Sequence, residues 1–266
     1  VTYIMRAVVT DIIAEKISLA LYVNERQMKK FVEAFWLLTF YLTAFAINGR
    51  LIHIYQPINS DRDKFFDIHL VPNPLTVGVG VARIFQTSYY LQSLYSTVFV
   101  EKRRSDFVLL IVHHLCTILL QLLSYSSGFM YAAITVELLH DINQIFLNSA
   151  KICEYVSMGG TKYSTVFKRA ARYVYIAFLF SWAYTRIWLY YKWVLTKILF
   201  KLYLMVPQTV PFRLFLYFPC MIIAILNIFW MMLFLRKGYK LLVNKNNPLL
   251  TESKCINLKG FFCYNF

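Results

Sequence analysis

Residues 106–151 read DFVLLIVHHLCTILLQLLSYSSGFMYAAITVELLHDINQIFLNSAK, and this stretch decides the fold. It contains two long apolar runs, Phe107–Tyr125 and Phe129–Ala150, on either side of a turn rich in Ser and ending in Gly. Crossing about 30 Å of hydrocarbon takes roughly 20 mostly apolar residues, so each run is long enough to span a membrane. Because only a tight turn joins the runs, we predict two neighbouring, antiparallel transmembrane helices.

Both predicted helices carry polar side chains that lipid tolerates poorly. These are His113, His114, Thr117 and Gln121 in the first helix, and Glu137, His140, Asp141, Gln144 and Asn148 in the second, which ends at Lys151. An ionisable group at the bilayer centre costs about 2.5–3.5 kcal/mol on insertion scales, so such residues indicate function by default. Positions 137, 141, 144, 148 and 151 alternate by four and three, which predicts a single polar stripe along the second helix.

The stripe and the histidines are expected at one depth in the membrane. His113 precedes Ser127 by as many residues as Asp141 follows it, and at about 1.5 Å of rise per residue both lie about 21 Å from the turn. Plain hydrogen-bonded helix contacts remain an alternative, and three histidines with one aspartate could ligate zinc. We expect no metal, because adjacent His113 and His114 point about 100° apart on a helix.

Four further apolar runs extend this pattern outward, at Phe35–Tyr55, Leu75–Val100, Ala171–Val194 and Phe212–Leu235. The chain is 59% hydrophobic and 15% charged, whereas a soluble domain usually carries about 25% charged residues. We therefore predict an all-α, polytopic membrane bundle of about six transmembrane helices surrounding a lipid-accessible cavity. Residues 1–30 are expected to form an amphipathic interfacial segment, residues 31–238 the membrane domain and residues 239–266 a cytosolic basic tail.

The net charge of +15 fits a membrane protein better than a nucleic-acid-binding protein. Lys and Arg lie mainly between the apolar runs and mostly on one side of the predicted membrane, so the positive-inside rule places both termini in the cytosol. The five cysteines show no paired spacing, which argues against a disulfide framework or a zinc knuckle.

The quoted stretch resembles the longevity-assurance motif of the ceramide synthases, a family within the TLC-domain superfamily. The matching residues are His113, His114, Thr117, Ser124, Tyr125, Leu139, His140, Asp141, Ala150 and Lys151. Lys30–Phe45, Pro72–Thr76 and Tyr89–Phe107 also resemble family segments, so the likeness extends from about Lys30 to Trp230.

The resemblance implies an endoplasmic reticulum enzyme that transfers a fatty acyl group from coenzyme A to the amine of a sphingoid base. It implies that His113 and His114 share the roles of base and nucleophile, for which an imidazole with an ordinary pKa near ~6.5 is suited. Asp141 would orient one imidazole. His140, Thr117 and Gln144 are expected to support the site, and Arg103, Arg104 and Lys162 to bind the phosphates of coenzyme A. Acyl-CoA is then a co-substrate and no cofactor is bound; a homo- or heterodimer is left open.

Five positions depart from the family pattern. They are Gly128, Tyr131, Gln144, Asn148 and Asn227, where the motif has Asn, Arg, Asp, Glu and His. A non-catalytic lipid-sensing or lipid-trafficking member of the superfamily is therefore the alternative. A transporter is a third reading, but it would spread polar residues through several broken spans.

Overall fold

Every regular element in the part of the chain that the structure describes is a helix. The computed structural model describes residues 2–55, 77–100, 106–127, 130–160, 162–198 and 212–243. The helices are, in chain order, α1 (Thr2–Ala7), η1 (Val8–Ala14), α2 (Glu15–Ala20), α3 (Glu25–Tyr55), α5 (Val77–Phe99), α6 (Phe107–Ser127), α7 (Met130–Ser157), α8 (Ser164–Trp182), η2 (Ala183–Ile198) and α10 (Phe212–Val243). Both η elements are π-helical. The predicted all-α class is confirmed for these residues.

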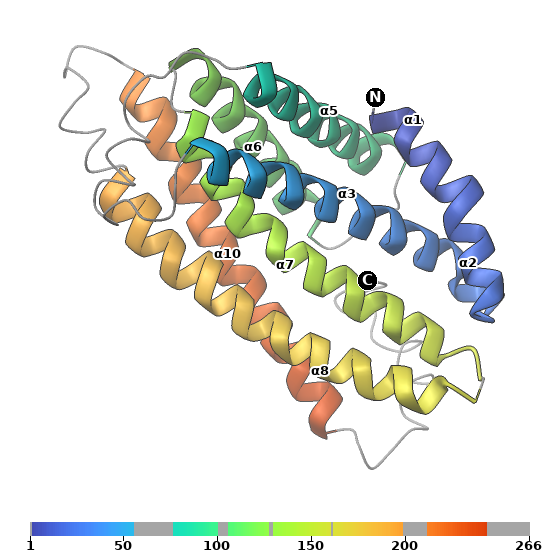
Figure 1. Cartoon of the computed structure of the whole chain (residues 1–266). Coiled ribbons are helices and arrows are strands. Elements are labelled where there is room, and N and C mark those ends of the chain that lie inside the picture. Colours follow the sequence, from blue (N-terminus) through green and yellow to red (C-terminus); the bar gives the residue numbers. More distant parts are fainter. Residues whose placement is uncertain are drawn as a thin grey trace.

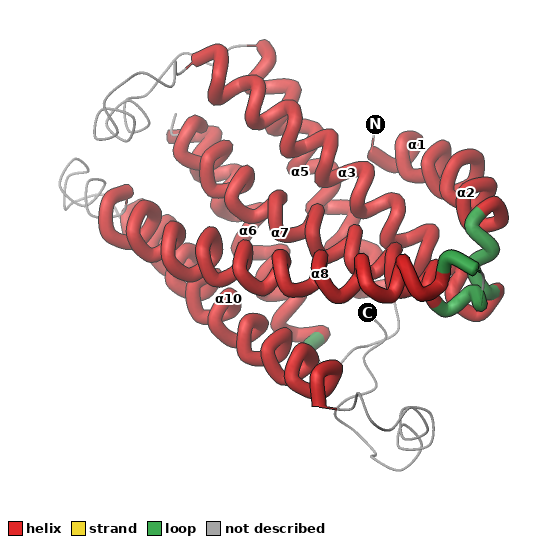
Figure 2. Tube along the Cα trace, turned by 60° about the horizontal axis from the view of Figure 1, so that its bottom comes forward, coloured by secondary structure: helices red, strands yellow, loops and turns green. Residues whose placement is uncertain are grey.

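Helix α7 lies in the middle of the bundle, between α3 and α8 (Figure 1). Helix α6 packs on α5 and on α10, and η2 continues α8 and also packs on α10. Figure 2 shows from a second direction that the long helices run roughly lengthwise beside one another. The arrangement places side chains from α5, α6, α7, η2 and α10 around a common interior.

Three of the described helices are both long and apolar enough to cross a membrane. They are Glu25–Ile54, Phe107–Ser126 and Tyr217–Tyr239. Helices α5, α7 and α8–η2 coincide with the other three predicted spans, but charged and polar side chains lower their hydropathy. The membrane bundle is therefore supported, whereas the predicted count of about six spans is not confirmed.

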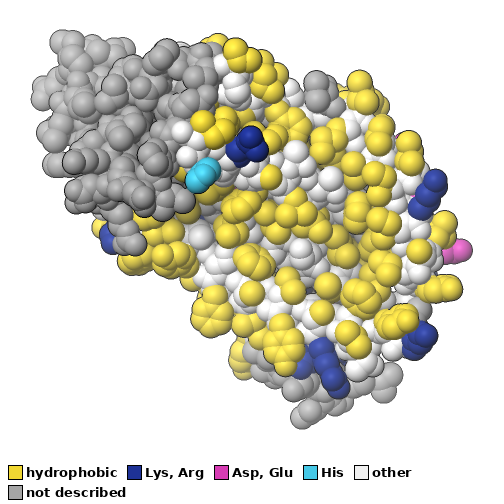
Figure 3. Space-filling view, in the orientation of Figure 1, with side chains coloured by type: hydrophobic (Ala, Val, Ile, Leu, Met, Phe, Trp, Pro, Cys, Tyr) yellow, Lys and Arg dark blue, Asp and Glu magenta, His cyan; other side chains and the backbone are white. Residues whose placement is uncertain are grey.

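The outer surface of α10 explains why such a bundle needs lipid around it. Six large apolar side chains spaced by three and four residues are exposed there, namely Phe218, Met221, Ile225, Ile228, Met232 and Leu235. On the face seen in Figure 3, hydrophobic side chains likewise spread along the bundle, with Lys and Arg mostly toward its margins. Contiguous exposed apolar surface of this kind is typical of a membrane or binding interface.

The N-terminal helices are fixed to the corner where α7 passes into α8. Asn24 caps α3, because its side-chain oxygen accepts a hydrogen bond from the Arg26 amide at 3.1 Å. A Cβ atom on Gly159 would come within 2.2 Å of the Tyr22 carbonyl oxygen, so only glycine fits this contact. Arg6 on α1 also pairs with Glu33 on α3 at 2.8 Å. These contacts place α1, η1 and α2 against one end of the bundle.

Candidate active site

The acidic face of α7 is bound to α5 and α6 through a buried polar network. Arg83 on α5 pairs through both terminal nitrogens with the Glu137 carboxylate. Glu137 also accepts a hydrogen bond from Gln121 on α6 at 2.8 Å. Gln86 accepts from Arg83 at 2.5 Å and donates to Asp141 at 3.2 Å. This network explains how α7 can bury two carboxylates, since each accepts hydrogen bonds from a neighbouring helix.

The two adjacent histidines of α6 point toward different neighbours. Their ring centroids are 5.7 Å apart. His113 meets the Trp230 ring of α10 edge-on at 5.1 Å. The His114 Nε2 lies 3.4 Å from the Ser93 hydroxyl of α5, and its ring is 6.1 Å from that of Tyr90. Both imidazoles are half-buried, and the Nδ1 atom of each is buried without a hydrogen-bond partner among the described residues.

His140 faces the other side of α7, toward η2. Its Nδ1 lies 2.7 Å from the Val136 carbonyl oxygen. Because a carbonyl can only accept, Nδ1 carries the proton and Nε2 is left as an acceptor. Nε2 is buried and finds no partner within the described part of the chain, while the ring meets Tyr190 edge-on at 5.6 Å. One helical turn on, Asn143 donates to the Thr185 hydroxyl of η2 at 2.6 Å.

Arg186 of η2 completes the interior and was not singled out from the sequence. Its side chain is 4% exposed. It donates to the His140 carbonyl oxygen at 3.0 Å and to Asn227 Oδ1 on α10 at 3.4 Å. The signal that could have found it is the one used for α7, namely a charge inside an apolar run.

The structure brings some predicted residues together and separates others. His113 lies within electrostatic range of His114, His140 and Arg186. Asp141 is 1% exposed, but across the described residues its only hydrogen bond comes from Gln86, so neither His113 nor His114 is bonded to it. The imidazole–aspartate hydrogen bond expected from the resemblance is thus not formed in this conformation.

The other predicted residues contribute in different ways. Thr117 donates to the His113 carbonyl oxygen at 2.9 Å, which stabilises the turn that carries the histidines. Gln144 is half-buried, and its backbone carbonyl oxygen accepts a hydrogen bond from the buried Asn148 side chain at 2.8 Å. The Lys162 ammonium lies over the Tyr163 ring at 5.0 Å. Arg103, Arg104, Gly128 and the Tyr131 side chain lie outside the described residues.

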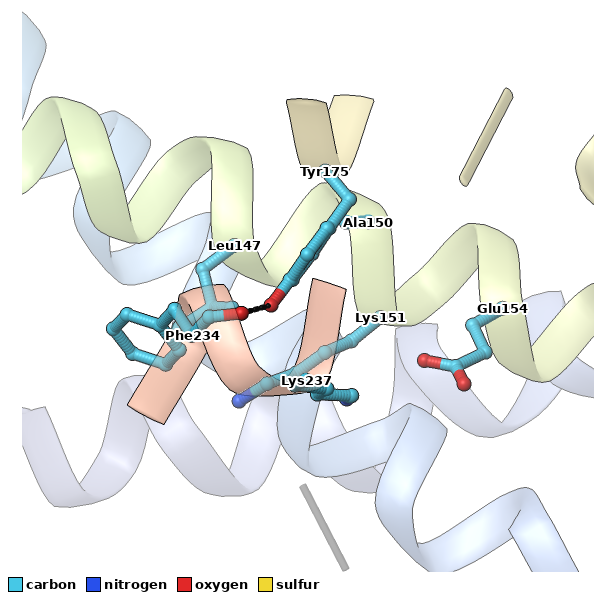
Figure 4. Close-up of a pocket in the computed structure, with 7 residues that line it drawn as sticks. All are labelled: Leu147, Ala150, Lys151, Glu154, Tyr175, Phe234 and Lys237. Atoms are coloured by element: carbon cyan, nitrogen blue, oxygen red, sulfur yellow. Dashed lines mark hydrogen bonds between the residues drawn. The ribbon is translucent and has the colours of Figure 1, made fainter. Parts of the chain in front are cut away.

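A small cleft opens between α7, α8 and α10 (Figure 4). It is lined by Leu147, Ala150, Lys151, Glu154, Tyr175, Phe234 and Lys237, and measures about 260 Å³ with its open mouth. The Tyr175 hydroxyl donates to the Phe234 carbonyl at 2.9 Å and holds α8 on α10. Figure 4 shows Lys151 extending from α7 toward the turn of α10 that carries Lys237. The cleft therefore presents two cations at the end of the polar stripe of α7.

Metal ligation has no support from the geometry of the described residues. Among them, no group of three or more His, Cys, Asp or Glu side chains is placed to hold an ion. The polar interior offers imidazoles, a carboxylate and a guanidinium instead, which are groups suited to proton transfer and to the binding of a carbonyl or an anion.

Comparison of the sequence with known proteins matches most of the chain to one family. Residues 30–236 match the model of the TLC domain. Human ceramide synthase 1 is 26% identical over 233 residues, which cover 84% of this chain and 64% of that protein. ASC1-like protein 3 of rice is 27% identical over 84% of this chain and 76% of that protein. Ceramide synthase LOH1 of Arabidopsis thaliana is 26% identical over 80% of this chain and 68% of that protein. The chain thus spans slightly less than two thirds of the human relative.

Proposed function

Because this chain belongs to the TLC-domain family, we propose that it is an acyl-CoA-dependent N-acyltransferase that makes ceramide or dihydroceramide from a sphingoid base. The relatives named ceramide synthase support the reaction class. The observation that carries the proposal is a pair of imidazoles on α6, with unpartnered Nδ1 atoms, inside a bundle whose exterior is apolar. Both substrates have long acyl or alkyl chains, so a reaction centre within such a bundle suits them.

The chemistry requires a base and an attacking group. The amine nitrogen attacks the thioester carbonyl carbon, a C–N bond forms, the C–S bond breaks, and coenzyme A leaves as its thiol. One imidazole accepts the amine proton and returns a proton to the leaving sulfur. Alternatively, one imidazole first takes the acyl group and the amine then attacks the acyl-imidazole. His113 and His114 share these roles, and Asp141 stabilises the cationic form of the site.

The phosphates of coenzyme A call for cations at the cytosolic end of the bundle. Lys151 and Lys237 in the cleft of Figure 4 supply two, at the end of the stripe that contains Asp141. The resemblance implies that Arg103, Arg104 and Lys162 supply further cations. Lys ammonium groups bind phosphate as point charges, so this surface suits a phosphorylated co-substrate.

A lipid-sensing or lipid-trafficking member of the family is the second candidate. It is favoured by Asp141, which is bonded to Gln86 rather than to an imidazole. It is also favoured by Asn148, whose amide is turned onto the backbone of its own helix. Such a protein would bind sphingoid bases or acyl chains without turnover.

Acyl transfer from labelled acyl-CoA to sphinganine in purified membranes separates these candidates. We expect wild type to be active, and His113→Ala, His114→Ala and Asp141→Asn each to lose about 100-fold or more of the rate, because positioned acid–base groups contribute 10²–10⁴-fold. His53→Ala, at an exposed position near the end of α3, is the matched control and should retain the rate. Lipid binding by a wild type without turnover would favour the second candidate.

A further inference from the structure

Two buried arginines in the bundle differ in their hydrogen-bond partners, and the mechanism above uses neither of them. Arg83 is 3% exposed and is paired through two nitrogens with the Glu137 carboxylate. Arg186 is 4% exposed, yet no carboxylate lies within hydrogen-bond distance of it in the described ranges. A buried charge without a bonded partner is strongly unfavourable in apolar surroundings, so its retention calls for a function.

The contacts of Arg186 hold the guanidinium in place without neutralising it. Its bonded acceptors are the His140 carbonyl and the Asn227 side chain, both neutral. The guanidinium stacks over the Trp182 ring at 4.1 Å, and the Trp182 indole N–H donates to the backbone carbonyl of Asn227 at 3.0 Å. The Nε–H is buried and has no partner in the described part of the bundle. The Arg83 Nε–H is unsatisfied in the same way, but Arg186 differs because its bonded acceptors are neutral, so its charge is held in place without a bonded anion among the described residues.

The Arg186 guanidinium contacts the backbone of His140 and is electrostatically coupled to the predicted reactive groups His113 and Asp141. Arg186 is within electrostatic range of His113 and His140. It is also within electrostatic range of Asp141, on α7, although no hydrogen bond joins the two. Arg186 follows directly on the change from α-helix to π-helix at Ala183, and π-helical segments occur frequently at functional sites. The Arg186 guanidinium and the Asp141 carboxyl group thus lie in the same interior as the imidazoles.

We propose that Arg186 binds the carbonyl oxygen of the acyl thioester and stabilises the negative charge that develops on this oxygen during acyl transfer. The inference rests on the proposed N-acyltransferase function. Attack of a neutral amine on a thioester gives an intermediate with a positive nitrogen and a negative oxygen. In this step Arg186 stabilises the negative oxygen, and an imidazole then removes a proton from the positive nitrogen. A preorganised donor placed where charge develops is commonly the largest contribution to catalysis.

The first test uses two inert analogues of the co-substrate that differ only at the carbonyl. In both, a methylene group replaces the thioester sulfur; one analogue keeps the carbonyl as a ketone, and the other has a second methylene group in place of the carbonyl. Wild type should bind the ketone about tenfold or more tightly, since a hydrogen bond to a charged donor is worth at least that factor. Arg186→Lys should lose this preference, because an ammonium does not reproduce the guanidinium geometry. Equal binding of the two analogues by wild type would overturn the proposal.

The second test neutralises Arg186 without removing it. Asn227→Asp places a carboxylate of similar shape 3.4 Å from the guanidinium. If Arg186 were only structural, this completed ion pair would leave turnover intact. We expect instead that Asn227→Asp lowers kcat by about 100-fold or more and abolishes the ketone preference, as removal of an oxyanion donor typically does. Asn227→Ala, which adds no charge, should retain the preference.

The outcomes separate the two proposals. A wild type without acyl transfer would remove the proposed function, whatever the analogues show. An active wild type whose kcat and ketone preference survive in Asn227→Asp would remove the role of Arg186 and leave the proposed function standing.

Discussion

Arg83 and Glu137 show how single residues determine which helices can neighbour one another. The pair joins α5 to α7, and Gln121 of α6 bonds to the same carboxylate. Both side chains are almost fully buried, so each charge is stable there only in the presence of the other. The network is therefore a condition for assembling the three helices around the histidines.

Removing one member of this pair should destabilise the protein more than removing both. Arg83→Met or Glu137→Leu should each lower the free energy of unfolding by about 3–5 kcal/mol, because each leaves an unpaired buried charge. The double variant Arg83→Met/Glu137→Leu should recover most of the loss. Thermal unfolding in detergent, followed by circular dichroism, measures both effects.

Arg6→Gln is the control for that series. The Arg6–Glu33 pair lies at the surface, with side chains 30% and 43% exposed, so its loss should cost under about 1 kcal/mol. Losses that simply add in the Arg83/Glu137 double variant would show that the two charges are not coupled.

At the residue scale, the sequence predicted burial better than partnership. Three members of the predicted polar stripe, Glu137, Asp141 and Asn148, are 7%, 1% and 0% exposed, whereas Gln144 and Lys151 are half-buried. The partners of the two carboxylates lie on α5 and α6, and nothing in local spacing identifies such cross-helix contacts. Arg83 and Arg186 could have been found by the rule that was applied to α7, because both lie inside apolar runs.

At the scale of elements, the tight turn between α6 and α7 had less influence on which helices pack together than the apolar faces of these helices. The turn predicted antiparallel neighbours, and the two helices do meet where Gln121 bonds to Glu137. The larger contacts of α7 are nevertheless with α3 and α8, while α6 packs on α5 and α10. Sequence spacing therefore could not predict that His113 would face Trp230.

The end of α7 should determine the affinity for acyl-CoA rather than the rate of the chemical step. Lys151→Ala and Lys237→Ala each remove a cation from the cleft between α7, α8 and α10. We expect each to raise the KM for acyl-CoA by about three- to tenfold with kcat nearly unchanged, since a contact made equally in ground and transition states affects binding alone.

Steady-state kinetics with varied acyl-CoA measures this effect. Glu154→Gln, which removes the carboxylate lining the same cleft, should lower that KM because less negative charge faces the phosphates. A drop in kcat without a change in KM for the lysine variants would argue that the cleft shapes the bundle rather than binding phosphate.

At the scale of the whole molecule, hydropathy selects fewer membrane spans among the described helices than the six predicted from the apolar runs. Only three of the described helices are apolar enough by composition. Helices α5, α7 and α8–η2 have less apolar sequences because they carry the interior polar groups, including Arg83, Asp141 and Arg186. In a bundle, such side chains face one another rather than lipid, so low hydropathy does not exclude a span. The family and the helical class could be predicted from sequence, but the number of spans depends on which faces the packing hides.

The location of the two chain ends decides between these counts. Six spans would place both termini on one side of the membrane, and the distribution of Lys and Arg predicts that this side is the cytosol. Three spans, being an odd number, place the termini on opposite sides. We expect epitope tags at Val1 and Phe266 to be stained together in cells whose plasma membrane alone is permeabilised. Six spans would keep the basic segments and the Lys151–Lys237 cleft on the cytosolic side, where coenzyme A is found. The control is a tag on a protein segment that faces the lumen, which is stained only after full permeabilisation. Staining of one terminus without the other would exclude six spans and would remove the access route proposed for acyl-CoA.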